Sequence, residues 1–292
     1  MAAHDNQDKQ SKNLRSIIVA VFISIAAIAF IVSGGDENID DLEEAPKTAE
    51  EIAALPGLTA RDIDRALDYS LDQVGRTKSV PAVFIKSLDV DLNRIKDVNE
   101  KKATFFKIML PIIAAQNDNI RIERKKITDD PADAPTSLYE KYDVEVGNVD
   151  VLLKRVDVIP ASLVLAKAAL ESGWGSSRFA RKGNNFFGMR TYDEDVPGIA
   201  PKKAEGFKVI KYKSIAHSVR FYMLNINTHS AYKKLRTARA KARDGGKTPN
   251  GLALTSYLTA YSEIPEEYGK RLRSIIKVNN LSRFDGVRLE SS

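Results

Sequence analysis

The chain has 292 residues, of which 43% are hydrophobic and 29% are charged, and it contains no cysteine. This length and composition allow a sizeable core, and the lack of cysteine excludes disulfides, thiolate nucleophiles and cysteine-based metal sites. Eight acidic residues and one lysine fall within residues 36–51, whereas the chain beyond residue 51 has 41 basic and 29 acidic residues, a net charge of about +12. A field of this sign attracts an anionic polymer, and both nucleic acid and the cell envelope fit that description.

A long apolar run lies near the start of the chain. Residues 17–32 are uncharged; basic residues precede them and the acidic segment follows. A helix over residues 14–33 spans about 30 Å, enough to cross a bilayer core, and the flanking charges predict that its N-terminus stays inside. We therefore expect a cytoplasmic tail (residues 1–13), an uncleaved single-pass anchor in the inner membrane (14–33) and an acidic linker (34–56). The rest of the chain would then face the periplasm or the outside of the cell.

Two alternatives to this anchor stay open, a cleaved signal peptide and a buried helix of a globular protein. Ala27 and Ala29 have the spacing that a signal peptidase needs, but they lie inside the apolar run, which disfavours cleavage. The run has no polar face, which disfavours a globular setting.

Residues 57–147 predict a mainly helical extension packed on the domain that follows. The apolar residues of its longest predicted helix, including Phe105 and Phe106, recur at helical spacing and should be buried. The predicted elements up to residue 156 are a helix over residues 61–74 capped by Thr59, a short helix or strand over 83–88, a long helix over 100–124 capped by Asn99, a short helix or turn over 138–146, and a helix over 149–156 capped by Asn148.

Glu171 lies in the last turn of the next predicted helix. Pro160 suits the first turn of that helix, and Gly173 supplies its stop. The carboxylate meets the negative end of the helix dipole and is desolvated by Leu170 and Trp174, and both effects disfavour its ionised form. A carboxyl group kept protonated suits general acid work, and removing its charge should cost the fold little. A solvated glutamate that merely ends a helix is the alternative.

The region after this helix changes character. Proline and glycine interrupt residues 191–212, and residues 207–212 have strand composition, which predicts a small β-hairpin lobe beside the helical body. The helices expected after the lobe are one capped by Ser214 and reaching residue 227, a basic one over 231–243, and two over 252–261 and 266–278. The expected fold class is mainly α, or α+β.

Two short segments carry a resemblance to a known family. Residues 168–175 read Ala-Ala-Leu-Glu-Ser-Gly-Trp-Gly, and residues 183–188 read Gly-Asn-Asn-Phe-Phe-Gly. Both resemble the glucosaminidase family that cleaves peptidoglycan glycan chains, glycoside hydrolase family seventy-three, with its mannosyl-glycoprotein endo-beta-N-acetylglucosaminidase-like domain. Residues 80–88 and 224–229 are similar to its Bax-like branch. The resemblance implies a lysozyme-like domain, here residues 148–285, that hydrolyses the bond following N-acetylglucosamine with Glu171 as general acid.

A second carboxylate and aromatic sugar contacts complete the expected site. Asp193, Glu194, Asp195 and Glu205 lie in the predicted lobe, and Glu205 is preferred, although the Thr-x-Glu-Tyr pattern of the family is missing. Without a second carboxylate, the N-acetyl group of the substrate would serve as nucleophile. Tyr261 resembles a tyrosine that reaches the active site in the family. Flat faces for sugar rings are expected from Trp174, Phe187, Tyr257 and Tyr268, for each of which core packing is the alternative.

Other chemistries find little support in the sequence. Three histidines and no cysteine make a metal site unexpected, and we expect no cofactor. Nucleotide-binding, nucleophile-elbow and EF-hand patterns are missing. The basic helix over residues 231–243 could bind phosphates or be a solvated helix face, and it lacks interleaved aromatic residues, so we expect no nucleic acid partner.

Three functions remain open on this basis. The first hypothesis is a peptidoglycan hydrolase that acts as an endo-beta-N-acetylglucosaminidase. The alternatives are a lytic transglycosylase, which also uses a single glutamate at a helix end, and a non-catalytic cell-wall-binding module, which the missing second-carboxylate pattern favours.

The predicted anchor can be tested by fractionation. Because residues 17–32 are apolar and lack a good exit site for cleavage, a C-terminally tagged full-length chain should sediment with membranes and resist extraction by alkaline carbonate. A soluble tagged protein whose N-terminus lies near Gly34 would contradict this prediction.

Overall fold

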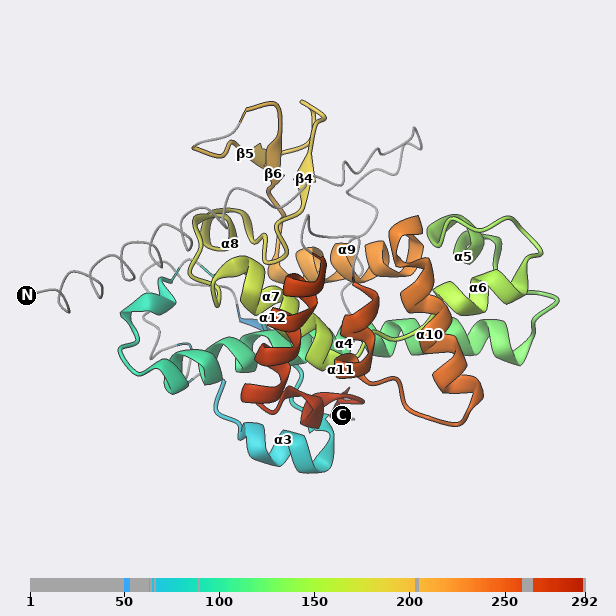
Figure 1. Cartoon of the computed structure of the whole chain (residues 1–292), viewed down its shortest axis with the longest axis horizontal. Coiled ribbons are helices and arrows are strands. Elements are labelled where there is room, and N and C mark those ends of the chain that lie inside the picture. The colour runs from blue at the N-terminus through green and yellow to red at the C-terminus, as the bar shows by residue number, and fades with distance from the viewer. Residues whose placement is uncertain are drawn as a thin grey trace, which may run out of the picture.

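The computed structural model describes residues 50–52, 63, 65, 67–88, 90–202, 205–258 and 265–290. Within these ranges the fold is mainly α-helical with small sheets, as the sequence predicts. The helices form one body, and a lobe of three strands projects from it at the top of Figure 1. No helix in the described ranges is long and apolar enough to cross a membrane, and the predicted anchor lies outside them.

The prediction of one helix over residues 61–74 is wrong, because helix α3 (Leu71–Thr77) begins within that range. The residues just before α3 are not helical. Ser70 is its N-cap, and its Oγ accepts a hydrogen bond from the backbone N–H of Gln73 at 3.3 Å. A capping serine starts a new helix at this point, so residues 61–74 do not form one continuous helix.

Helix α4 (Val98–Asp129) is the longest helix of the described chain and runs across the body in Figure 1. Its N-cap is Asp97, whose Oδ1 accepts two backbone N–H groups at 2.8 Å. The predicted cap, Asn99, therefore lies inside the helix, because an aspartate two residues earlier already satisfies the first turn. Phe105 and Phe106 are buried, as predicted.

Helix α7 (Ala161–Ser172) lies inside the body. It contacts α4, α11 (Gly251–Leu254), α12 (Pro265–Val278) and the 3-10 helix η6 (Leu281–Phe284), and residues 161–169 are all buried. Gly173 ends the helix with φ of 58°, as predicted. The sequence predicts one buried face; the burial on all sides follows from a helix that is apolar almost all round.

The remaining helices mostly begin where the sequence predicts. Asn148 caps α6 by accepting the N–H of Val151 at 3.3 Å, and Ser214 caps α9 by accepting the N–H of His217 at 3.1 Å. The remaining helices are α5 (Thr136–Lys141), α6 (Val149–Arg155), α8 (Arg178–Gly183), α9 (Ile215–Thr228), α10 (Lys233–Asp244), and the 3-10 helices η2 (Leu92–Arg94), η3 (Ser230–Tyr232) and η4 (Thr255–Tyr257). Helix α8 is not predicted, and the helix predicted over residues 252–261 is divided between α11 and η4.

The projecting lobe is an antiparallel sheet of three strands, where the sequence predicts a hairpin. Its central strand, β6 (Lys208–Ile210), pairs with β4 (Arg190–Thr191) on one side and with β5 (Gly198–Ile199) on the other. The lobe begins two residues after Gly188, so its position depends on the loop that follows α7.

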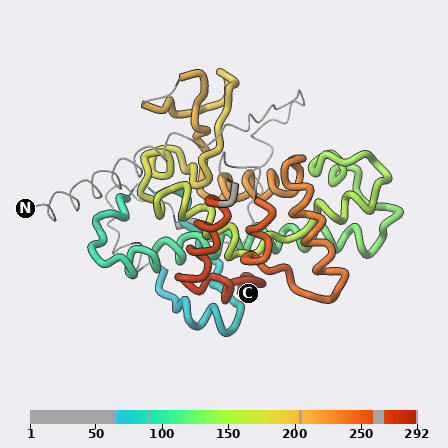
Figure 2. Tube along the Cα trace, viewed as in Figure 1, coloured from blue at the N-terminus to red at the C-terminus, as the bar shows by residue number. Residues whose placement is uncertain are grey.

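Two parallel pairs join distant parts of the chain. Strand β1 (Glu50–Ile52) pairs with β3 (Val83–Ile85), which settles the open choice between helix and strand there. Strand β2 (Ser79–Val80) pairs with β7 (Arg288–Leu289). Figure 2 shows that the segment around α3, in light blue, lies beside the red C-terminal segment.

Candidate active site

The chain turns sharply after α7. Gly173, Trp174 and Gly175 have φ of 58°, 59° and 76°, which is left-handed backbone. For Trp174 this conformation costs on the order of 1 kcal/mol. Contacts of the indole ring offset that cost, because Phe105 and Phe106 of α4 pack edge-on against it with centroids 5.8 and 5.6 Å away. The turn leaves Glu171 at the end of a buried helix.

One oxygen of the Glu171 carboxylate has two hydrogen-bond donors. Its Oε1 accepts from Nζ of Lys167 at 2.9 Å and from the hydroxyl of Tyr268 at 3.3 Å. Lys167 lies one turn earlier on α7, whereas Tyr268 comes from α12. The Lys167 ammonium also lies 4.8 Å from the centre of the Tyr268 ring. The three side chains therefore form one cluster between two helices.

This cluster contains a buried ion pair. The side chains of Lys167 and Glu171 are 2% and 7% exposed. Burial lowers the pKa of Lys167 from its usual value, and the Glu171 carboxylate opposes that change. A buried ammonium is tolerated only beside an anion, so Glu171 is the counter-ion of Lys167. This ion pair argues against the expectation that the charge of Glu171 can be removed at little cost to the fold, and a larger cost is now expected.

The second oxygen of Glu171 faces a glycine. Gly188 has φ of 70° and is exposed, and a Cβ atom added to it would lie 3.5 Å from Oε2 of Glu171. Within the described ranges, no hydrogen bond reaches Oε2. The loop therefore passes close to the carboxylate, and Oε2 keeps its capacity to accept or donate a hydrogen bond as far as the described residues are concerned.

Asn185 holds the Gly188 loop on the lobe. Its Nδ2 donates to the carbonyls of Met189 and Ile210, both at 2.9 Å, and its Oδ1 accepts the N–H groups of Phe187 and Met189 at 3.3 and 3.2 Å. The side chain is buried. These four bonds fix the position of Gly188 relative to both the α7 end and β6.

The other predicted site residues are dispersed. The ring of Phe187 is buried and stacks on Tyr222, with centroids 4.1 Å apart and planes at 7°, so one face is covered and the other is in the core. Tyr257 is 40% exposed on η4. Glu205 is exposed, and its carboxylate forms no hydrogen bond or ion pair with a described residue. Tyr261 lies outside the described residues.

Lys167 is the member of the cluster that sequence reasoning missed. Its signal was spacing, since it is the single charged residue four positions before Glu171 in an apolar helix, and side chains at i and i+4 are neighbours. The structure brings Glu171 and Tyr268 together around it. Among the predicted residues, those two share a direct contact.

An aromatic surface on the lobe was also missed. The rings of Tyr192 and Phe207 have centroids 6.3 Å apart, and Tyr192 is 48% exposed. The Arg190 guanidinium lies 4.3 Å from the Phe207 ring. Exposed tyrosine offers a flat apolar face and a hydroxyl, which suits a sugar ring, and Tyr192 is only four residues from Gly188.

A family model matches residues 148–281 of the chain, and its description is mannosyl-glycoprotein endo-beta-N-acetylglucosaminidase. The matched range begins at the cap of α6 and includes α7, the lobe and α12. It therefore contains Glu171, Lys167 and Tyr268.

Two bacterial proteins resemble the chain over longer or comparable ranges. Protein bax of Escherichia coli is 32% identical over 204 residues, which are 65% of this chain and 73% of that protein. Exo-glucosaminidase LytG of Bacillus subtilis is 26% identical over 150 residues, 48% of this chain and 51% of that protein. No solved structure matches the chain at a significant level.

The ion pair predicts a coupling between two substitutions. Lys167→Met removes the ammonium with little change in volume and leaves a buried carboxylate without its cation, so unfolding in urea at neutral pH should show a loss of about 3–5 kcal/mol. In the double variant Lys167→Met, Glu171→Gln no buried charge remains, and its cost should be smaller than the sum of the two single costs.

The matched control is Lys102→Met. The Lys102 ammonium lies 5.2 Å from the centre of the Trp174 ring and has no ion pair among the described residues. Its replacement should cost no more than about 1 kcal/mol. Strictly additive effects of the two cluster substitutions would refute the buried pair.

Proposed function

Because the chain belongs to the glucosaminidase family, in its Bax-like branch, we propose that it hydrolyses the glycan strands of peptidoglycan with Glu171 as the general acid. One observation supports this assignment most strongly. The Glu171 carboxylate has Oε1 held by Lys167 and Tyr268, while Oε2 faces the exposed Gly188 loop. A glycosidase acid must present one carboxyl oxygen to the glycosidic oxygen, and Oε2, which has no hydrogen bond with a described residue, is the candidate.

The proposed chemistry is a single proton transfer at the leaving group. Protonated Oε2 of Glu171 donates its proton to the glycosidic oxygen as the bond from that oxygen to the anomeric carbon breaks, and water supplies the new hydroxyl on that carbon, either directly or after a covalent intermediate. The carboxylate that results is already paired with the Lys167 ammonium, so the charge formed in this step is stabilised without rearrangement.

Two groups are proposed as the partner of Glu171 that acts at the anomeric carbon. Glu205 on the lobe is our choice for the second carboxylate, since its exposed side chain has no partner among described residues and is free to meet a ligand. In the other version the N-acetyl group of the substrate attacks the anomeric carbon, and no second carboxylate is required. Glu205→Gln separates them: activity should fall by at least about tenfold in the first version and change little in the second.

Other aspects of the assignment extend the same proposal. Residues 148–285 would form the catalytic domain, and residues 57–147 would pack on it as a helical extension. The anchor over residues 14–33 would hold the enzyme in the inner membrane with this domain outside the cytoplasm. Trp174, Tyr257, Tyr261 and the lobe residue Tyr192 would contribute to sugar contacts, and no cofactor is invoked.

The position of cleavage along the strand is part of the proposal. The family model is described as an endo-acting enzyme, and LytG is named as an exo-acting one. We propose endo cleavage for this chain. A digest of long strands then releases fragments of many lengths early in the reaction, whereas exo cleavage releases a single short product from the start.

Glu171→Gln is the decisive substitution. The amide has no proton to donate, so release of reducing ends from purified peptidoglycan should fall by about 10²–10⁴-fold. Because the single variant leaves Lys167 without its counter-ion, the double variant Lys167→Met, Glu171→Gln is assayed beside it as the folded reference, and circular dichroism verifies both. A folded double variant with wild-type activity would refute the role of Glu171.

Mass spectrometry of the wild-type digest separates the alternative functions. Hydrolysis leaves N-acetylglucosamine at the new reducing end, whereas a lytic transglycosylase leaves an anhydro-sugar. A wall-binding module sediments with peptidoglycan and releases neither product. The presence of one carboxylate in the buried cluster is compatible with the transglycosylase, which is why product identity is measured rather than rate alone.

Gly188→Ala tests the open side of the carboxylate. The new methyl group would lie 3.5 Å from Oε2 of Glu171, where a substrate oxygen must approach. Gly147→Ala is the matched control, since Gly147 has φ of 91° but nothing within 4 Å of an added Cβ atom. Both variants should lose about 1–2 kcal/mol of stability from left-handed backbone, and only Gly188→Ala should lose at least about tenfold in kcat/KM.

A further inference from the structure

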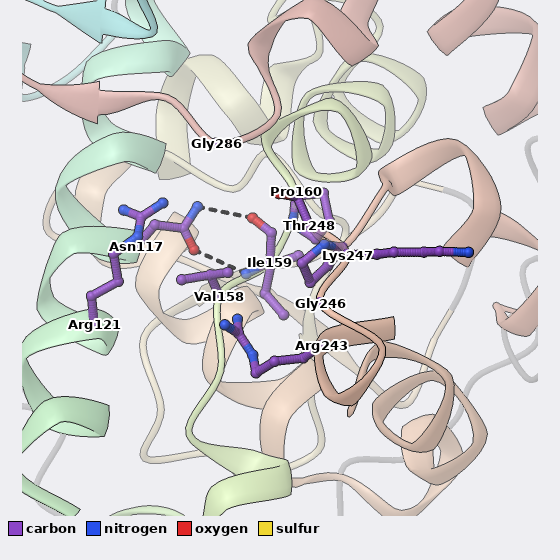
Figure 3. Close-up of a pocket in the computed structure, with 11 residues that line it drawn as sticks. Asn117, Arg121, Val158, Ile159, Pro160, Arg243, Gly246, Lys247, Thr248 and Gly286 are labelled. Carbon is purple, nitrogen blue, oxygen red and sulfur yellow. Dashed lines mark hydrogen bonds between the residues drawn. The ribbon is translucent and has the colours of Figure 1, made fainter. Parts of the chain in front are cut away.

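A hollow of about 340 Å³ lies at the other end of α7 from Glu171. It is lined by residues from α4, from the segment that leads into α7, and from the loop after α10. Asn117, Arg121, Ile159, Pro160 and Arg243 are among them. In Figure 3 the guanidinium groups of Arg121 and Arg243 lie to either side of Val158, and the Lys247 side chain leads away from both. No acidic residue is among those that line it.

Hydrogen bonds fix the floor of this hollow. Nδ2 of Asn117 donates to the carbonyl of Ile159 at 2.8 Å, and its Oδ1 accepts the N–H of Ile159 at 2.9 Å. Figure 3 shows both bonds as dashed lines. This reciprocal pair fixes α4, which contains Arg121, against the segment before Pro160. Arg243 belongs to α10, and its hydrogen bonds to Asp157 hold it on the same segment.

Both arginines retain unused donors. Arg121 donates from Nη1 to Asp118 at 2.7 Å, and Arg243 donates from Nε and Nη2 to Asp157. Nη2 of Arg121 and Nη1 of Arg243 make no hydrogen bond with any residue in the described ranges. Their side chains are 25% and 35% exposed, so a solute can reach them.

The surrounding charges do not balance. Asp118 is shared by Arg121 and Arg288, and Asp157 is shared by Arg239 and Arg243. Two carboxylates thus serve four guanidinium groups. Arg124, in the same region, donates only to backbone carbonyls. Asp244 also attracts Arg124, but the direct ion pairs still leave an excess of positive charge, which favours a bound anion.

The arginines of this cluster lower one another's pKa values in addition to the larger effect of burial. Burial lowers the pKa of Arg121, and Arg288 and Arg243 lower it further against the opposing effect of Asp118. Burial also lowers the pKa of Arg239 to about 10, with Arg243 and Arg124 contributing in the same direction. A bound anion would relieve this repulsion.

We propose that the hollow is a binding site for an oxyanion, a carboxylate or a phosphate group, held by the guanidinium groups of Arg121 and Arg243. Planar guanidinium donors match the oxygens of both groups. The volume admits such a group together with the first atoms of the chain that carries it. A phosphate ester and the free carboxylate of a peptide share this chemistry, and the test distinguishes them.

The site is independent of the proposed glycosidase activity. Pro160, at its edge, precedes Glu171 by eleven residues, which is roughly 16 Å along the helix axis. Substitution of Arg121 therefore leaves the Lys167–Glu171–Tyr268 cluster untouched. Binding and hydrolysis can be measured on the same protein without one result deciding the other.

The test is a thermal unfolding titration of the full chain in detergent at constant ionic strength, with inorganic phosphate replacing chloride. Wild-type protein should show an unfolding midpoint that begins to rise near the dissociation constant and then increases with the logarithm of the phosphate concentration. Arg121→Gln should weaken the apparent affinity at least about tenfold, because a charge-assisted fork is lost. Arg121→Lys should weaken the apparent affinity by a smaller factor, because lysine keeps the positive charge but lacks the planar pair of donors of a guanidinium group.

The matched control is Lys241→Gln, which removes one positive charge from the same helix as Arg243 at an exposed position outside the hollow. It should bind phosphate within about twofold of wild type. The carboxylate arm compares a short peptide with its C-terminal amide. Stabilisation by the free acid alone assigns the site to peptide carboxylates, and stabilisation by phosphate alone assigns it to phosphate esters. Equal midpoint shifts in all variants, or none with either probe, would overturn the proposal.

Discussion

The fold depends on the burial of helix α7, which is complete as far as Ala169 and partial at Leu170 and Glu171. Residues 161–169 are inaccessible to water, including the charged residue Lys167. A helix in this position must satisfy its ends and its charge from within the protein. Asp285 supplies the first end, where its Oδ1 accepts the N–H of Ser162 at 2.9 Å, and left-handed Gly173 supplies the second. Glu171 supplies the counter-charge.

These requirements give Glu171 two tasks. As counter-ion of Lys167 it belongs to the core, and at the last turn of α7 its Oε2 also lies next to the exposed Gly188. The same burial that makes the ion pair necessary restricts the carboxylate to one orientation, because Oε1 is held from α7 and α12 together. Precise placement of the candidate acid is thus a consequence of core packing, and does not require a separate device.

Sequence reasoning succeeded where a local signal decided the structure. The caps Asn148 and Ser214, the stop at Gly173 and the strand over β6 each depend on residues within a few positions of one another. It failed at Asn99, where Asp97 offered an equal local signal. The contact of Tyr268 with Glu171 links residues 97 positions apart, and no periodicity in one sequence reports such a pairing. Lys167 had a local signal, its i, i+4 spacing from Glu171. That spacing indicates a strong interaction only when both side chains are buried, which the sequence alone does not report.

The two ends of α7 differ in how their charges are balanced. At the C-terminal end one ammonium meets one carboxylate in a dry cluster, where a change of one proton alters the whole local charge. At the N-terminal end four arginines share two aspartates, and removing one charge leaves an excess of the same sign. A balanced dry pair is suited to proton transfer, because its electrostatic energy depends strongly on one proton. An unbalanced, partly exposed cluster is suited to holding an anion, because binding reduces a repulsion that the fold itself maintains.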